Sequence, residues 1–245
     1  MKADPADQER LLELNDIDLG LARTRRTLES LPEAQRVTEL DASLVTARAH
    51  QREALATLEE LRAELRRAES DVELVEKRIA QDSQRVDQSS SVKDVQGLQH
   101  EIESLRHRLQ VLEEVELEVM ERVEAAEQGL DAAEKESSSL ESQLDEAKRA
   151  RDAAVAQLEK ERTELAATRS ELVAGLPEPL VALYERQRER YGQGASLLRA
   201  GVSGASGVTL TESDLREVRN AAPDDVVLCP DSNAILVRTN ESGLS

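Results

Sequence analysis

Apolar residues recur at alternating intervals of three and four positions from Val95 to Leu172, and this run limits what the chain can fold into. With Val95 as position a of a heptad, the a and d positions keep one phase throughout and are mostly Leu, Val, Ile and Ala. A period of 3.5 residues places them on one seam of a supercoiled helix. Such a helix would be roughly 120 Å long at 1.5 Å per residue. Because it cannot fold back on itself, a second helix must cover its seam.

The composition agrees with this interpretation. Of 245 residues, 34% are charged and 1% are aromatic, with no Phe and no Trp. A globular domain of this size would bury several large aromatic side chains. Abundant Ala, Leu, Glu and Arg at heptad spacing are typical of a coiled coil. Disorder also produces polar chains, but a disordered chain does not hold a heptad register for this length.

The heptads predict three helices, at about 6–31, 32–87 and 92–173, with a serine-rich turn at 88–91. Pro32 is tolerated in the first turn of a helix but not inside one, and the heptad phase shifts there from Gln35 to Val37. Ser91 and Asp94 resemble a capping box at the start of the third helix. A turn this short makes its flanking helices antiparallel neighbours. The predicted fold class is mainly α, with a long antiparallel coiled-coil hairpin over 1–175.

After the coil the chain changes character. We expect a short helix and a flexible linker over 176–200, a small α+β module over 201–240, and a tail at 241–245. Within the module, the sequence predicts a strand at 208–210, a helix capped by Thr211 and Asp214, and a hairpin formed by 226–228 and 235–237. About 40 residues with so few apolar side chains usually need a metal, a disulfide or a docking partner to fold.

The whole chain resembles the bacterial C4-type zinc ribbon family, which joins a long helical hairpin to a C-terminal zinc ribbon. The matching segments are Met1–Asp4, Leu98–Leu105, Leu183–Arg186, Pro223–Val227 and Ile235–Arg238. In that family, one C-x-x-C pair precedes the small helix and a second lies in the final hairpin turn. The resemblance therefore implies that residues 201–240 form a degenerate zinc ribbon whose ligand positions are Ser203, Ser206, Cys229 and Ser232.

Serine occupies three of these four positions. A structural Zn²⁺ site normally needs four Cys or His donors, and no His lies in this module. We therefore expect no metal and no cofactor. Cys229 is the only cysteine, so no internal disulfide forms. Its sequence neighbours offer no cation that would lower its pKa, which favours a vestigial ligand over a reactive thiol.

No enzyme signature is present, neither a phosphate-binding loop with Lys nor G-x-S-x-G nor H-E-x-x-H. His100 and His107 fall on the outer face of the third helix, which favours solvated side chains over metal ligands. The polar start and the lack of a long apolar run predict a cytoplasmic protein without a membrane segment. We expect no enzymatic activity.

Two surface features could bind partners. Between Glu113 and Glu136, ten acids face only two bases, Arg122 and Lys135; this acidic belt is either a solvated face or a docking surface for a basic partner. Aromatic and basic residues also gather between coil and module, where they either pack at the joint or stack on single-stranded bases. These candidate interaction residues are Tyr184, Arg186, Arg188, Arg190 and Tyr191.

The predicted function is a non-enzymatic adaptor or scaffold that binds protein partners through the hairpin and the C-terminal head. The alternative is an RNA- or DNA-binding protein that acts through the head. A net charge of -19 opposes sequence-independent binding of nucleic acid, which relies on clustered Lys and Arg. Family members have been linked to flagellar or type III secretion assembly through partner proteins, and in some cases to RNA. A monomer and a homodimer both satisfy the heptad pattern.

Overall fold

The computed structural model describes residues 1–244; Ser245, the last residue of the predicted tail, lies outside the described part. Helix accounts for 77% of the chain, and a small three-stranded sheet lies near its C-terminus, which confirms the predicted fold class. The chain divides into two compact units, one built from residues 1–32 with 150–244 and the other from 33–149. No helix among the described residues is both long enough and apolar enough to span a membrane.

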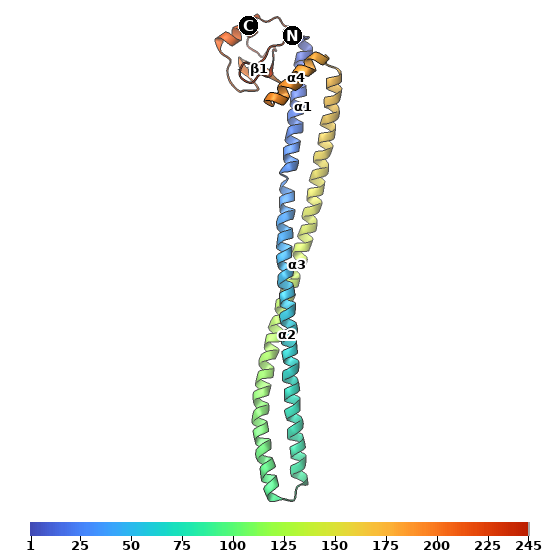
Figure 1. Cartoon of the computed structure of the whole chain (residues 1–245), viewed down its shortest axis with the longest axis vertical. Helices are drawn as coiled ribbons and strands as arrows, with labels where there is room; N and C mark the ends of the chain where they lie inside the picture. Colours follow the sequence, from blue (N-terminus) through green and yellow to red (C-terminus); the bar gives the residue numbers. More distant parts are fainter. Residues whose placement is uncertain (245) are drawn as a thin grey trace. The chain divides into compact units, whose positions relative to one another are not determined.

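Four helices precede the sheet in the sequence: α1 (Pro5–Glu29), α2 (Pro32–Gln88), α3 (Val92–Ala174) and α4 (Glu178–Tyr191) (Figure 1). Asp4 caps α1 by accepting a 2.9 Å hydrogen bond from the Ala6 N–H, and Pro32 begins α2, as the shift in heptad phase predicts. The Ser91 hydroxyl accepts a 3.4 Å hydrogen bond from the Asp94 N–H at the start of α3. Local capping therefore explains where these helices begin.

In the unit formed by 33–149, α2 and the first part of α3 form an antiparallel hairpin (Figure 1). Arg48 bonds Glu141 at 2.6 Å, and Arg62 bonds Glu127 at 2.6 Å. Between 92 and 149, every residue outside the predicted seam is exposed, and every seam residue is buried or half-buried. The heptad pattern thus gives the covered face of α3 correctly, residue by residue.

The seam prediction is wrong at Glu161 and Thr168, which are exposed. Both lie in the unit that contains α1 and the C-terminal head. There the covered face of α3 includes the neighbouring positions Arg169 and Val173, because Arg169 binds a carboxylate of α1 and Val173 packs on the apolar core of this unit. Arg169 also binds Glu185 of α4, so contacts with a third helix accompany this change in the covered face.

The head contains β1 (Ala195–Arg199), β2 (Val202–Ser203), α5 (Glu212–Asn220) and β3 (Ile235–Val237), with strand order β2-β1-β3. β1 and β2 are antiparallel, whereas β1 and β3 are parallel and pair Ala195 with Ile235. Both hydrogen bonds of the capping box between Thr211 and Asp214 are present at the start of α5, which confirms the predicted helix cap.

Two predictions for the head are wrong. The segment predicted as flexible linker contains β1, the central strand. The expected hairpin does not form either, because 226–228 is not a strand and contributes one isolated bridge, Leu228 to Ile235; 208–210 likewise contributes only a bridge from Thr209 to Val202. β3 pairs instead with β1. In this arrangement, helices can cover both faces of the strand pair.

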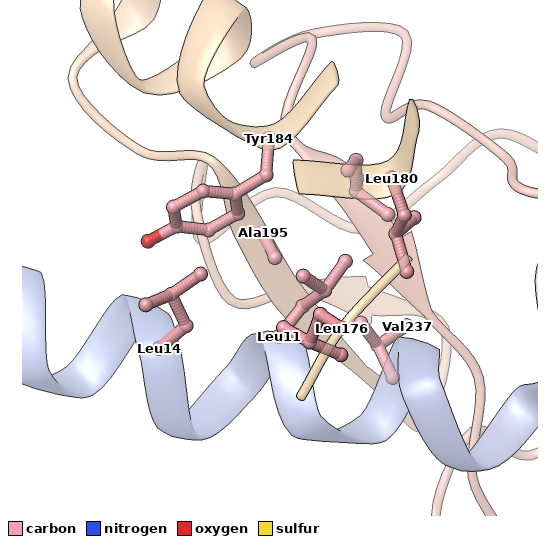
Figure 2. Packing of buried hydrophobic residues seen from close by; sticks show 8 residues of the cluster. Leu11, Leu14, Leu176, Leu180, Tyr184, Ala195 and Val237 are labelled. Atoms are coloured by element: carbon pink, nitrogen blue, oxygen red, sulfur yellow. The ribbon is translucent and has the colours of Figure 1, made fainter. Parts of the chain in front are cut away.

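The sheet separates two apolar clusters. On one side Ala195, Ile235 and Val237 pack against α1 and α4 (Figure 2). On the other side Leu198 and Leu236 pack with residues of α5 and its flanking loops. The first cluster also contains Leu11, Leu14, Leu176, Leu180 and Tyr184; the second also contains Leu210, Val218 and Cys229.

Candidate functional site

Two four-residue turns, Ser203–Ser206 and Cys229–Ser232, are built alike. In the first, the Gly207 N–H donates to the Ser203 carbonyl at 2.8 Å, and the Ser203 N–H donates to the Val208 carbonyl at 3.1 Å. In the second, the equivalent bonds run from Asn233 to Cys229 at 2.9 Å and from Cys229 to Ala234 at 2.8 Å.

The side chains and dihedral angles of the turns also correspond. The last serine of each turn accepts a hydrogen bond from the N–H two residues later, at 3.3 Å for Ser206 and 3.4 Å for Ser232. The residue after each turn has a positive φ, 68° at Gly207 and 57° at Asn233. Gly and Asn tolerate this left-handed conformation best. The two turns are therefore one backbone design used twice.

The turns bring three of the four predicted ligand positions together. Ser203 and Cys229 are fully buried, and the hydroxyls of Ser203 and Ser232 lie near enough to the Cys229 thiol to lower its pKa. Burial raises the pKa of the Cys229 thiol, but these hydroxyls and the nearby backbone N–H groups outweigh it, so that the pKa lies below its usual value. Ser206 is only half-buried, and its hydroxyl accepts from the Val208 N–H instead.

One thiol and three hydroxyls do not fit a structural Zn²⁺ site. Zinc in such sites is held by four Cys or His ligands, and a neutral hydroxyl is a poor donor beside a thiolate. Among residues 1–244, no group of three or more His, Cys, Asp or Glu side chains is arranged to hold a metal. The Ser203 hydroxyl instead lies 3.5 Å from the Ser196 hydroxyl, within hydrogen-bond distance.

A second polar cluster centres on Asp18 of α1, whose side chain is 6% exposed. Arg169 of α3 donates to it at 2.7 Å, Arg188 of α4 at 3.0 Å and the Tyr184 hydroxyl at 2.7 Å. Glu185 binds both arginines in turn. Three helices of this unit are therefore tied together by one buried carboxylate whose charge is matched.

Tyr184 is fully buried in the apolar cluster of Figure 2. Burial, and next its hydrogen bond to Asp18, raise the pKa of its hydroxyl well above the usual value. A Cβ at Gly194 would overlap the tyrosine ring, so only glycine fits at this position beside the ring. Tyr184 therefore packs where α1, α4 and the sheet meet, as one of the two sequence-based interpretations expects.

The five candidate interaction residues divide into two groups. Tyr184 is fully buried, whereas Arg188 is half-buried and engaged in ion pairs with Asp18 and Glu185. Arg186, Arg190 and Tyr191 are exposed, and the Arg190 guanidinium lies 5.4 Å from the centre of the Tyr191 ring. Only this second group presents a stacking surface to solvent.

Sequence reasoning missed three residues that make long-range contacts within this unit. Arg238 donates hydrogen bonds of 2.7 to 3.2 Å to five backbone carbonyls between 218 and 225. Lys2 forms an ion pair with Asp224 at 2.8 Å, and the flanking backbone of the N-terminus pairs with 224–226. Asp18 is the third. Nothing in the local sequence distinguishes these residues, because each acts on partners distant along the chain.

Comparison with known proteins identifies this architecture. The family model described as the CT398-like coiled coil hairpin domain matches residues 14–192. A solved structure from Mycobacterium smegmatis is 36% identical, covers 97% of this chain and all of its own, and superposes with a TM-score of 0.80. The structure of CT398 from Chlamydia trachomatis is 16% identical, covers 96% and 98%, and has a TM-score of 0.62; it shows the fold alone.

Two curated relatives are uncharacterized proteins of Mycobacterium tuberculosis, from strains CDC 1551 and H37Rv. Each is 42% identical over 65 residues. The match spans 26% of this chain and 26% of each relative.

Proposed function

Because this chain belongs to the family of CT398-like coiled coil hairpin domains, we propose that it is a non-enzymatic scaffold that binds protein partners through its hairpin and its head. One observation carries the proposal. Along 92–149 of α3, only the seam is covered, and the exposed remainder includes Val111, Val115, Leu117 and Met120. A long exposed helical surface with apolar side chains offers contact area to other proteins.

We propose further that the head is a degenerate zinc ribbon that folds without metal. The repeated backbone design of the two turns supports this proposal, since four side chains at equivalent positions are what a four-ligand site requires. The buried carboxylate network and the two apolar clusters supply stabilisation that does not depend on a metal. A stoichiometric amount of zinc in protein purified without added metal would contradict this proposal.

A second candidate function is binding of single-stranded nucleic acid by the head. The exposed pair of Arg190 and Tyr191, with Arg186 one helical turn away, favours it. The net charge of the whole chain opposes nucleic-acid binding, because the chain carries 51 acids against 32 Lys and Arg. We place the scaffold first for this reason, and we propose the cytoplasm as its location.

Affinity isolation of the full chain from cells, with and without nuclease treatment, tests the scaffold. We expect the same proteins to be recovered in both preparations at physiological salt. Partners that disappear after nuclease treatment would favour the nucleic-acid function. In that case, binding to single-stranded RNA or DNA should weaken steeply as salt rises, and Arg186→Ala with Arg190→Ala should abolish it.

A further inference from the structure

One side of the hairpin formed by 33–149 carries exposed apolar residues. Leu117 and Met120 of α3 are 59% and 49% exposed, and they lie three residues apart on a line that continues at intervals of three and four. This spacing follows one side of a coiled-coil helix. We call the line the Leu117 stripe; its members, all exposed, are Glu113, Leu117, Met120, Glu124, Glu127, Asp131 and Glu134.

The Leu117 stripe holds five acidic side chains and no basic one. Glu127 pairs across the hairpin with Arg62 at 2.6 Å, and Asp131 pairs with Lys135 at 2.6 Å. Within the described part of the chain, no ion pair involves Glu113, Glu124 or Glu134. Carboxylates of like sign along one line repel one another, so a basic partner would relieve this repulsion.

The facing part of α2 does not neutralise the stripe. The ion pair of Arg62 with Glu127 shows which side of α2 lies beside it, and this side carries four acids and two arginines between 59 and 76. Of the two arginines, Arg66 forms no ion pair within residues 1–244. The exposed apolar pair thus lies in a field of negative charge that is shared by both helices.

We propose that the Leu117 stripe binds a basic amphipathic helix of a partner protein. This inference rests on the proposed scaffold function and names its surface and its partner class. The apolar face of the incoming helix covers Leu117 and Met120, while its Lys and Arg residues pair with Glu113 on one side and with Glu124 and Glu134 on the other. Met120 adapts to different apolar side chains because its thioether chain is flexible.

The length of the stripe sets the length of the partner segment. From 113 to 134 it extends about 32 Å at 1.5 Å per residue, which is the length of a helix of about 21 residues. Recognition of this kind needs apolar residues at helical spacing on the partner. A short basic peptide without an apolar face, or an acidic amphipathic helix, does not meet both requirements.

The opposite side of the same hairpin supplies a matched control. There Leu74, Val111 and Val115 are 67%, 47% and 44% exposed. On that side Arg78 pairs with Glu101 at 3.0 Å and Arg122 with Glu64 at 3.2 Å. Apolar exposure is therefore similar on the two sides, whereas the opposite side carries arginines that form ion pairs and the Leu117 stripe carries five acids and no base.

The test is a titration of the full chain into a fluorescent 21-residue peptide with Leu at helical spacing and Lys elsewhere. A peptide of identical composition and scrambled order serves as the second probe. We expect Leu117→Ser with Met120→Ser to weaken binding by at least about tenfold. Val111→Ser with Val115→Ser should change it by less than about twofold. Glu113→Gln with Glu124→Gln should weaken binding more at low salt than at high salt.

Four results would overturn the inference. The amphipathic peptide could fail to bind, the scrambled peptide could bind equally well, or the Val111 and Val115 variant could lose as much affinity as the Leu117 and Met120 variant. The fourth is a homodimer that buries the stripe and that dissociates in the Leu117 and Met120 variant. Sedimentation and helical circular dichroism of each variant identify the last case and exclude unfolding. If the peptide does not bind but affinity isolation still recovers protein partners, only the stripe proposal is refuted. If affinity isolation recovers no protein partners, the scaffold function itself is refuted.

Discussion

The Tyr184 hydroxyl donates a 2.7 Å hydrogen bond to Oδ2 of Asp18, although 166 residues separate the two in the sequence. The same carboxylate accepts from Arg169 and Arg188. One buried side chain therefore joins α1 to α3 and α4 within this unit.

Asp18→Asn should lower the free energy of unfolding by about 3 kcal/mol, because it leaves two arginines without their shared carboxylate. Tyr184→Phe removes one hydrogen bond to a charged acceptor and should cost about 2 kcal/mol. Urea unfolding followed by circular dichroism measures both changes. Asp16→Asn is the control, since Asp16 is exposed on the same helix; an equal loss there would show that the network contributes nothing.

The buried tyrosine also predicts a pH dependence. The pKa of Tyr184 is raised in the folded chain, by burial first and by Asp18 second, whereas an unfolded tyrosine has a pKa of about 10. The contribution of Tyr184 is complete below about pH 10 and is lost as the pH rises above that value, at up to about 1.4 kcal/mol per pH unit.

The free energy of unfolding, measured for the wild type and for Tyr184→Phe between pH 8 and 11, isolates this effect from other titrating groups. We expect the difference between them to be constant up to about pH 10 and then to shrink. Tyr191→Phe, at an exposed position, should show no such change. A difference that is flat across the whole range would contradict burial of the Tyr184 hydroxyl beside a charged Asp18.

Ser137 offers a stabilising substitution in the hairpin. Its hydroxyl lies at a seam position, buried and without a hydrogen-bond partner within the described residues. Ser137→Ala should raise the free energy of unfolding by about 1–2 kcal/mol, because it removes an unsatisfied polar group and improves helix propensity. Ser138 is exposed on the same helix, so Ser138→Ala should raise the free energy of unfolding only by the smaller contribution of helix propensity. Thermal unfolding compares the two; equal gains would mean that the Ser137 hydroxyl is hydrated.

The paired turns predict that zinc binding can be installed. Ser203→Cys, Ser206→Cys and Ser232→Cys together with Cys229 would provide four thiolates on two turns of one backbone design. We expect this variant to bind one zinc ion per chain and the wild type none, as measured by metal analysis after dialysis. The same variant with Cys229→Ser serves as control and should bind far more weakly. Zinc in the wild type at one ion per chain would contradict the metal-free head.

The hairpin was predictable from sequence because its stabilising pattern is local and repeated. Each apolar residue from Val95 to Leu158 needs only a helix opposite it, so a 3.5-residue period specifies both the element and its covered face. Glu161 and Thr168 depart from the pattern near Arg169, which binds carboxylates of both α1 and α4. The prediction thus fails where α3 contacts two helices instead of one.

The head was predicted less well, because its contacts are distant in sequence. Glycines at 192 and 194 favour the prediction of a linker, so the strand that begins at Ala195 was not predicted. The parallel pairing of this strand with Ile235 has no local signature, in contrast to an antiparallel hairpin joined by a tight turn. Asp18 and Arg238 look like ordinary surface charges until the fold brings their partners to them. Of the candidate interaction residues, sequence could not separate the buried Tyr184 from the exposed Tyr191.

If the partners of this chain are proteins, site-specific cross-linking in cells will capture them. A photoreactive residue at Glu114 would report on the hairpin, and one at Arg186 would report on the head; both positions are exposed. The scaffold account predicts adducts that survive nuclease and are destroyed by protease, from at least one of the two positions. Adducts that nuclease removes from both positions would contradict it.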